Sequence, residues 1–292
     1  MLGSMNPASV PSVPSIAVTG ASGRLGGTTA RFLADQGVPL RLLLRDATRA
    51  PDLKGTTTAE AGFGDKEAVR RALDGIDTVF MVSAAESEDR LEQHFTFIDA
   101  AVEAGVDHIV YTSFFGAAPD ATFTLARDHF ATEEKLRTAG PKFTLLRNNL
   151  YADILPDFAD AEGVIRGPAE DGRAGFVARS DAARAAAAIL QQPIPHAGFT
   201  YELTGPEALT LDEAAAILAE TTGRPMSFRN ETVDEAYASR AHYGAPPWQL
   251  DAWVSTYTAI ARGEMDKTTN DVELLTGQAP LSLRQLFSRP LV

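Results

Sequence analysis

Six short apolar segments alternate with helix-like segments over the first half of the chain, and this alternation constrains the fold most. The apolar segments are nearly continuous, as in strands that helices cover on both faces. Between them, apolar residues recur every three to four positions, which is typical of amphipathic helices. The strand segments are 15–19, 40–44, 56–61, 76–82, 108–112 and 143–146. The pattern predicts an α/β fold: a Rossmann-type, doubly wound parallel sheet with right-handed crossovers.

The alternation weakens after Tyr151, where prolines and glycines interrupt a mainly helical pattern. We therefore expect an NAD(P)-binding domain over 15–151 and a smaller, mainly helical substrate lobe over 152–292. An open alternative is that some later segments return to the Rossmann sheet. Residues 1–14 are rich in Pro and Ser and are expected to be a disordered lead-in or tag, with Met5 as a natural start.

Composition excludes several classes of function. The net charge of −13 argues against a binder of nucleic acid or of an anionic membrane surface. The chain has no cysteine, so it has no disulfide, no thiolate nucleophile and no cysteine-ligated metal. Its five histidines show no metal-ligand spacing, and no metal site is expected. With no apolar stretch long enough to span a bilayer and no signal sequence, we expect a cytoplasmic protein.

A glycine-rich loop joins the first strand to the first helix. Gly20, Gly23 and Gly26 follow a G-x-x-G-x-x-G spacing. Gly20 suits the sharp turn, Gly23 lets backbone approach a pyrophosphate, and Gly26 lets the helix pack closely on the strand. This context favours a dinucleotide-binding loop at a helix N-terminus. The alternative is a tight turn whose glycines serve packing alone.

The end of the second strand bears on which dinucleotide is bound. There Arg45 precedes Asp46, and an arginine matches the 2′-phosphate of NADP whereas an acid matches the ribose of NAD. Arg24 in the glycine loop could add a second positive charge. We expect NADP(H), with NAD(H) bound more weakly if Asp46 points inward. The alternative is that Arg45 is simply a solvated charge.

Taken together, segments 19–26, 111–113, 129–137 and 144–151, with Arg45, resemble the NmrA-like atypical short-chain dehydrogenases/reductases. The segment HFATEEKLR at 129–137 and the segment TLLRNNLY at 144–151 are especially similar to triphenylmethane reductases and NADPH:quinone oxidoreductases. The resemblance implies an NADP(H)-binding Rossmann lobe, a small helical lobe and a cleft between them.

The resemblance also implies roles for individual residues. Arg45 would grip the 2′-phosphate, Asp65 would contact the adenine side, and Ser83 would lie beside the ribose. Asp65 could equally be only a helix N-cap. Asn149 and Tyr151 would flank the nicotinamide end. The pyrophosphate would be cradled by Gly20, Ser22, Gly23, Arg24, Leu25 and Gly26.

The chain departs from ordinary short-chain dehydrogenases in its acid–base residues. Those enzymes place a Tyr four residues before a Lys, and none of the five lysines here follows such a Tyr. His129 and Glu133 occupy the matching positions, so simple alcohol dehydrogenation is disfavoured. A quinone or a triarylmethyl cation needs little acid help, and positioning in a dry aromatic cleft would suffice. His129 could protonate a quinone oxygen or merely hydrogen-bond the cofactor.

The expected substrate is therefore a small aromatic electrophile. Its cleft would be lined by Phe114, Phe115, Tyr151 and Trp248, each of which could instead be plain core, and Tyr151 is also a candidate catalytic residue. The leading hypothesis is an NADPH-dependent reductase of quinones or related planar electrophiles. A second hypothesis is an NADP(H)-sensing regulator without turnover. A third, an isomerase or epimerase, would normally need the missing Tyr/Lys pair.

Overall fold

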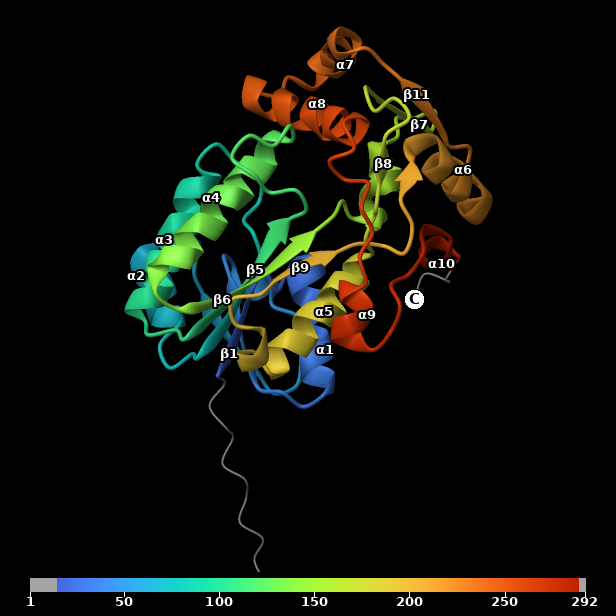
Figure 1. Ribbon diagram of the computed structural model, residues 1–292. Helices are drawn as coiled ribbons and strands as arrows, with labels where there is room; N and C mark the ends of the chain where they lie inside the picture. Colours follow the sequence, from blue (N-terminus) through green and yellow to red (C-terminus); the bar gives the residue numbers. More distant parts are fainter. Residues whose placement is uncertain (1–14, 289–292) are drawn as a thin grey trace, which may run out of the picture.

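The computed structural model describes residues 15–288, and the expected lead-in, residues 1–14, lies outside them. A parallel sheet of seven strands forms the centre of the molecule (Figure 1), in the order β3-β2-β1-β4-β5-β6-β9. The predicted doubly wound Rossmann-type sheet is thereby confirmed. Its strands are β1 (Ile16–Thr19), β2 (Leu40–Leu44), β3 (Thr56–Glu60), β4 (Thr78–Met81), β5 (His108–Phe114), β6 (Lys142–Asn148) and β9 (Thr200–Leu203).

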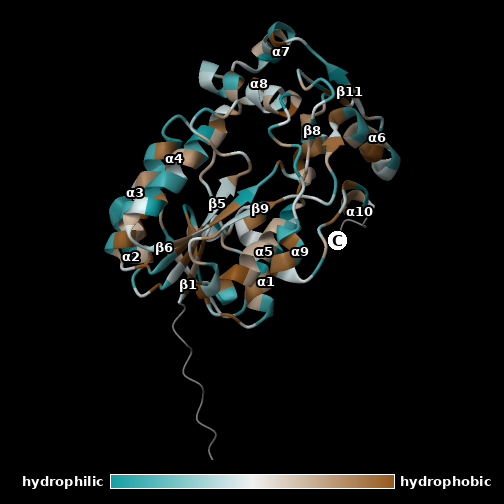
Figure 2. Ribbon diagram, viewed as in Figure 1, coloured by the Kyte–Doolittle hydropathy of each residue, from teal (hydrophilic) through white to brown (hydrophobic). Residues whose placement is uncertain are grey.

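Helices cover both faces of this sheet, which explains why its inner strands, such as β1 and β4, are buried on both sides, whereas the edge strand β3 is more polar and partly exposed. One face packs against α1 (Arg24–Asp35) and α5 (Arg179–Gln191), with α9 (Asp271–Thr276) beside α5. The other face packs against α2 (Lys66–Ala72), α3 (Arg90–Glu103) and α4 (Thr124–Ala139). Figure 2 shows apolar residues on α1 and α5 and hydrophilic residues on the outer side of α3 and α4.

A second part of the molecule, which includes α6, α7 and α8, has its own apolar cluster. Two small sheets brace it, one pairing β8 with β10 antiparallel and one pairing β7 with β11 parallel. Its elements are η2 (Ala152–Phe158), β7 (Val164–Gly167), β8 (Arg173–Ala174), β10 (Leu209–Thr210), α6 (Leu211–Thr222), β11 (Ser227–Asn230), α7 (Val233–Arg240), η4 (Ala241–Tyr243), α8 (Pro247–Ala261) and α10 (Leu283–Phe287). Two short 3-10 helices, η1 (Ala47–Arg49) and η3 (Ile194–His196), lie elsewhere in the chain.

The chain after Tyr151 contributes to both parts. The strand β9 pairs with β6, α5 packs on α1, and α9 packs on α5 and β9. The division of the chain into domains stays a prediction, but these three elements lie with the Rossmann sheet. The sequence did not indicate β9, because four residues between Gly198 and Gly205 carry too short an alternation to be distinguished from a loop.

The strand order brings the site together. Because the order reverses at the neighbouring strands β1 and β4, their carboxyl ends open a crevice at the edge where α/β folds bind ligands. The glycine loop follows β1, and the residues after β4, β5 and β6 reach the same edge. Within residues 15–288, no helix is both long and apolar enough to cross a membrane.

The contact between α5 and α1 depends on small side chains. Ala186 is fully buried in the apolar cluster that α5 shares with α1 and the sheet, whereas Ala188 on the same helix is half-buried. We expect Ala186→Leu to lower the free energy of unfolding by about 1–3 kcal/mol through overpacking, and Ala188→Leu to change it little. Urea unfolding of the two variants checks this. Equal tolerance of both would contradict the packing of α5 on the sheet.

Candidate active site

The glycine loop leaves the start of α1 open. Gly20 has a φ of +62°, and a Cβ at Gly26 would lie 2.5 Å from the carbonyl oxygen of Thr19. The helix begins after Gly23, which offers no capping side chain, and the first intrahelical bond joins Gly27 N to Gly23 O at 3.0 Å. The amides of residues 24–26 therefore precede the helical hydrogen-bond ladder and can donate to an anion.

The two charged residues that follow β2, Arg45 and Asp46, make different contacts. Asp46 accepts hydrogen bonds from the backbone N–H of Thr48 (3.0 Å) and from its hydroxyl (2.6 Å). These bonds lower the pKa of Asp46, the hydroxyl bond most. Arg45 is exposed, and a Cβ built on Gly62 would lie 3.9 Å from its Cγ. Arg45 thus lies beside the loop that carries Asp65, and Asp65 caps α2 by accepting from Ala68 N (3.0 Å).

A cavity of about 170 Å³ lies where β4, β5 and β6 end. Five of the predicted residues line it: Ser83, Phe114, His129, Asn149 and Tyr151. The other lining residues are Glu86, Arg90, Thr112, Ser113, Phe123, Leu125, Asn148, Leu150 and Ile154. Its size suits a small planar group, since it is below the roughly 300 Å³ of typical ligand pockets.

Two predicted lining residues lie elsewhere. Phe115 is buried, its N–H donating to Asn148 O (2.9 Å), and its side chain does not line this cavity. Trp248 is half-buried in the first turn of α8 and does not line it either. Sequence reasoning could not separate these aromatic residues from the lining ones, because apolar patterning indicates burial rather than the space a ring faces.

His129 lies at the centre of a buried hydrogen-bond network. Arg90 Nη2 donates to His129 Nε2 at 2.9 Å, because an arginine can only donate. His129 Nδ1 therefore carries the proton and donates to Tyr111 Oη at 2.8 Å. Burial first, then the Arg90 and His94 charges, lower the pKa of His129 well below its usual value. The geometry thus disfavours the expectation that His129 protonates a substrate, since both ring nitrogens are hydrogen-bonded and the lowered pKa keeps the imidazole neutral.

The position of the usual lysine is part of a buried ion pair. Glu133 is fully buried, accepts from Ser113 Oγ at 2.5 Å and binds the Arg147 guanidinium at 2.8 and 2.7 Å. Arg137 adds a weaker contact at 3.3 Å. These contacts occupy both carboxylate oxygens. The cluster therefore fixes α4 on β5 and β6 and offers no free proton donor.

Tyr151, the other candidate catalytic residue, is half-buried at the cavity. The guanidinium of Arg179 lies over its ring at 5.1 Å, and burial raises the pKa of the phenol. A phenol with a raised pKa stays protonated, so Tyr151 can donate a hydrogen bond but is a poor base.

The structure adds Asn148 to the predicted Asn149. The Asn149 side chain is used locally, donating to Met265 O (3.0 Å) and accepting from Leu150 N (2.8 Å). The Asn148 Oδ1 is buried at the cavity and has no hydrogen-bond partner among residues 15–288. Of the two, Asn148 is the one with an acceptor to offer a ligand. The role of Asn149 at the nicotinamide end stays a prediction, and Asn148 is a second candidate that the sequence did not indicate.

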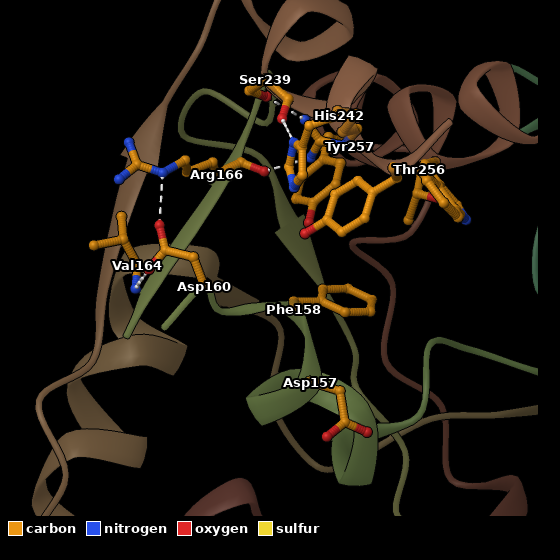
Figure 3. Close-up of a pocket in the computed structure, with 12 residues that line it drawn as sticks. Asp157, Phe158, Asp160, Val164, Arg166, Ser239, His242, Thr256 and Tyr257 are labelled. Atoms are coloured by element: carbon orange, nitrogen blue, oxygen red, sulfur yellow. Dashed lines mark hydrogen bonds and ion pairs between the residues drawn. The ribbon is translucent and has the colours of Figure 1, made fainter. Parts of the chain in front are cut away.

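A larger cavity of about 450 Å³ lies in the second part of the molecule (Figure 3). The rings of Phe158 and Tyr257 face it with centroids 6.1 Å apart, while the Arg166 guanidinium turns away to Asp160. The tryptophan here is Trp253. The short helix η2 lines both cavities, since Ile154 faces the small one and Phe158 faces the large one. Among the described residues no acidic or histidine cluster could hold a metal ion.

An uncapped helix after a glycine turn, at the strand-order switch of a doubly wound sheet, defines a Rossmann-type dinucleotide-binding protein. The model of the NmrA-like family matches residues 13–242, and the chain belongs to that family.

Several proteins to which the chain is similar are named as reductases or oxidoreductases. Quinone oxidoreductase 2 of Escherichia coli is 32% identical over 94% of this chain and 97% of its own length. NAD(P)H azoreductase of Xenophilus azovorans is 28% identical over 90% and 93%. The structure of the triphenylmethane reductase of Citrobacter sp. with NADP(H) superposes with a TM-score of 0.81, at 30% identity over 93% and 98%. That of the E. coli quinone oxidoreductase with NADPH gives 0.85, at 31% over 94% and 98%.

The buried histidines predict an acid-sensitive fold. Burial lowers the pKa of His94 to about 3 and that of His108 to about 4, and it lowers the pKa of His129 as well. In the unfolded chain all three histidines titrate near 6.5. Their contribution to the free energy of unfolding is therefore complete above that pH and is lost as the pH falls toward the pKa values of the folded protein. Each histidine should lower the free energy of unfolding by about 1.4 kcal/mol per pH unit below 6.5.

Urea unfolding between pH 7 and 5 measures this slope. His94→Gln should reduce the pH dependence of the free energy of unfolding by the part that one histidine contributes. His242→Gln, at an exposed position, should leave this pH dependence unchanged. A free energy of unfolding that stays flat from pH 7 to 5 would show that these histidines are not held neutral.

Proposed function

We propose that the protein is an NADPH-dependent reductase that transfers a hydride to a quinone or a related planar electrophile. The observation that carries the proposal is the small cavity at the same carboxyl edge of the sheet as the open N-terminus of α1, lined by Phe114 and Tyr151 but lacking a Tyr/Lys acid–base pair. The reductase relatives support the same class of reaction.

The residues present fit a phosphorylated dinucleotide. The free amides of residues 24–26 suit a pyrophosphate, the missing Cβ at Gly26 lets α1 pack closely on the end of β1, and Arg45 suits the 2′-phosphate. Because Asp46 is engaged by Thr48, it is turned to its own loop rather than to a ribose, which favours NADP(H) over NAD(H). Asp65 for the adenine side and Ser83 for the ribose stay predictions. The buried Asn148 Oδ1 suits a carboxamide N–H at the nicotinamide end.

The bound cofactor would supply a hydride, and the protein's own contribution is positioning. Phe114, Phe123 and Leu125 form an apolar wall that keeps water from the reacting face. A quinone or a triarylmethyl cation gives a delocalised product, so the lack of an acid is no obstacle.

The regulatory alternative is less supported. A sensor needs no acceptor cavity beside the nicotinamide, and the relatives named above are reductases. A small aromatic molecule is therefore the proposed partner. The cytoplasmic location and the absence of nucleic-acid and membrane partners stay predictions.

Turnover tests the proposed function directly. The purified protein is mixed with NADPH and a panel of quinones and triarylmethane dyes, and the absorbance of NADPH is followed. We expect oxidation of NADPH that depends on the acceptor. NADPH binding with no turnover of any acceptor would favour the regulator.

Arg45 should bind the 2′-phosphate of NADPH. We expect Arg45→Ala to weaken NADPH binding by about tenfold or more and NADH binding by no more than about twofold, since one charge-assisted contact is lost. Arg49→Ala, at an exposed position four residues later, is the matched control and should alter neither. Calorimetric titration measures both affinities, and an equal loss for both nucleotides would remove Arg45 from phosphate recognition.

A further inference from the structure

Arg90 is a buried cation at the wall of the small cavity. It is the first residue of α3 and only 4% exposed. Its Nε donates to Ala84 O at 3.1 Å and its Nη2 donates to His129. Its Nη1 is buried and makes no hydrogen bond among the described residues, and its ion-pair contact with Asp128 Oδ2 is long, at 3.5 Å. A buried N–H that has an ion pair at this distance but no hydrogen bond still has room for an acceptor that a ligand supplies.

The guanidinium is held in place from two directions. His129, itself fixed by Tyr111, holds one end, and the loop carbonyl of Ala84 holds the other. The same loop is anchored by Ala84 N, which donates to His94 Nε2 at 2.9 Å. A ligand oxygen in the cavity would thus meet a charge whose orientation needs no rearrangement.

Two carboxylates lie near Arg90. Asp128 Oδ2 is 3.5 Å from Nη1, but its side chain is 29% exposed and it does not line the cavity. Glu86 lines the cavity, and burial raises the pKa of its carboxyl group and of the Asp128 carboxyl group. Each acid therefore holds its negative charge less readily than a free carboxyl does, whereas an arginine keeps its charge, so the charge that acts most strongly inside the cavity is positive. The other lining side chains are neutral, including His129.

We propose that Arg90 binds the oxygen of the hydride acceptor and stabilises the negative charge that develops on it, with His129 as the positioning residue for Arg90. The inference rests on the proposed reductase function and narrows its substrate class. The site would prefer neutral carbonyl electrophiles, above all quinones, over cationic triarylmethane dyes.

The charge balance gives this preference. A quinone takes up the hydride that NADPH supplies, NADPH is oxidised to NADP⁺, and the quinone is reduced to a hydroquinone monoanion. Arg90 neutralises that oxyanion, and a proton from water completes the hydroquinone after release. A triarylmethyl cation instead loses its positive charge on reduction. Arg90 therefore repels the cation as it binds, and no negative charge develops in the transition state for Arg90 to stabilise.

4-Nitrophenol is a direct probe, because its anion resembles the hydroquinone monoanion and the two protonation states absorb differently. We expect the wild-type protein with NADP⁺ to bind the phenolate more tightly than the neutral phenol. Arg90→Gln should weaken phenolate binding at least about tenfold while neutral phenol binding stays within about twofold. Arg224→Gln removes an equal charge at an exposed site and should change neither.

Variants at two further positions keep the test decisive if Arg90→Gln fails to fold. Glu86→Gln removes the acid of the cavity wall and should strengthen phenolate binding. His129→Leu should weaken it by freeing Arg90, whereas His129→Gln, which retains an acceptor, should restore it. A phenolate preference unchanged in Arg90→Gln, or in both Glu86→Gln and His129→Leu, would overturn the inference.

The dye-to-quinone comparison separates this inference from the proposed function. For the wild type we expect a higher kcat/KM with a para-quinone than with a triarylmethane dye, and a smaller ratio in Arg90→Gln. Turnover with dyes favoured over quinones would overturn the Arg90 inference while leaving the reductase function intact. No turnover with either class, with phenolate still bound through Arg90, would overturn the function instead.

Discussion

The close approach of α1 to the end of β1 is the constraint on which the site depends. At Gly26 the helix lies so near the Thr19 carbonyl that no side chain fits between them. This contact aims three free amides at the carboxyl edge of the sheet, where the order of the strands reverses. A diphosphate bound there would extend along the crevice, with its nicotinamide end at the cavity beyond β4 and β5.

Around that cavity, the acid–base residues of ordinary short-chain dehydrogenases have been replaced by two buried networks. Glu133 is hydrogen-bonded to Ser113 and ion-paired with Arg147, and both ring nitrogens of His129 are hydrogen-bonded, to Arg90 and Tyr111. Neither network can deliver a proton readily, but the second places a fixed positive charge beside the reacting space. The arrangement suits an acceptor that needs its negative charge stabilised rather than an oxygen protonated at once.

The sequence predicted the sheet well because its inner strands are buried on both faces and most of its helices are periodic. It also indicated Ser83 and Phe114 at one edge, since residues at the carboxyl ends of parallel strands meet there. His129 lies inside α4 and was indicated instead by its match to the tyrosine position of ordinary short-chain dehydrogenases. It did not predict Arg90, because nothing in the pattern of a polar helix start distinguishes an inward-facing arginine from a solvated one. Burial and direction are properties of the packed chain, and the roles of the site residues stay predictions.

The second part of the molecule was the least predictable. Its strands, such as β8 with two residues, are too short to produce a periodic signal, and they form because the chain meets partners distant in sequence. The aromatic lining of the large cavity likewise depends on which face of α8 turns inward, so Trp253 lines it and Trp248 does not.

A crystal structure of the protein with NADP⁺ and a para-quinone tests the central claim most directly. The account predicts the diphosphate on the amides of residues 24–26, the 2′-phosphate at Arg45 and a quinone oxygen within hydrogen-bond distance of Arg90. A diphosphate bound away from the glycine loop, or a quinone whose oxygens avoid Arg90 in an otherwise occupied cavity, would contradict it.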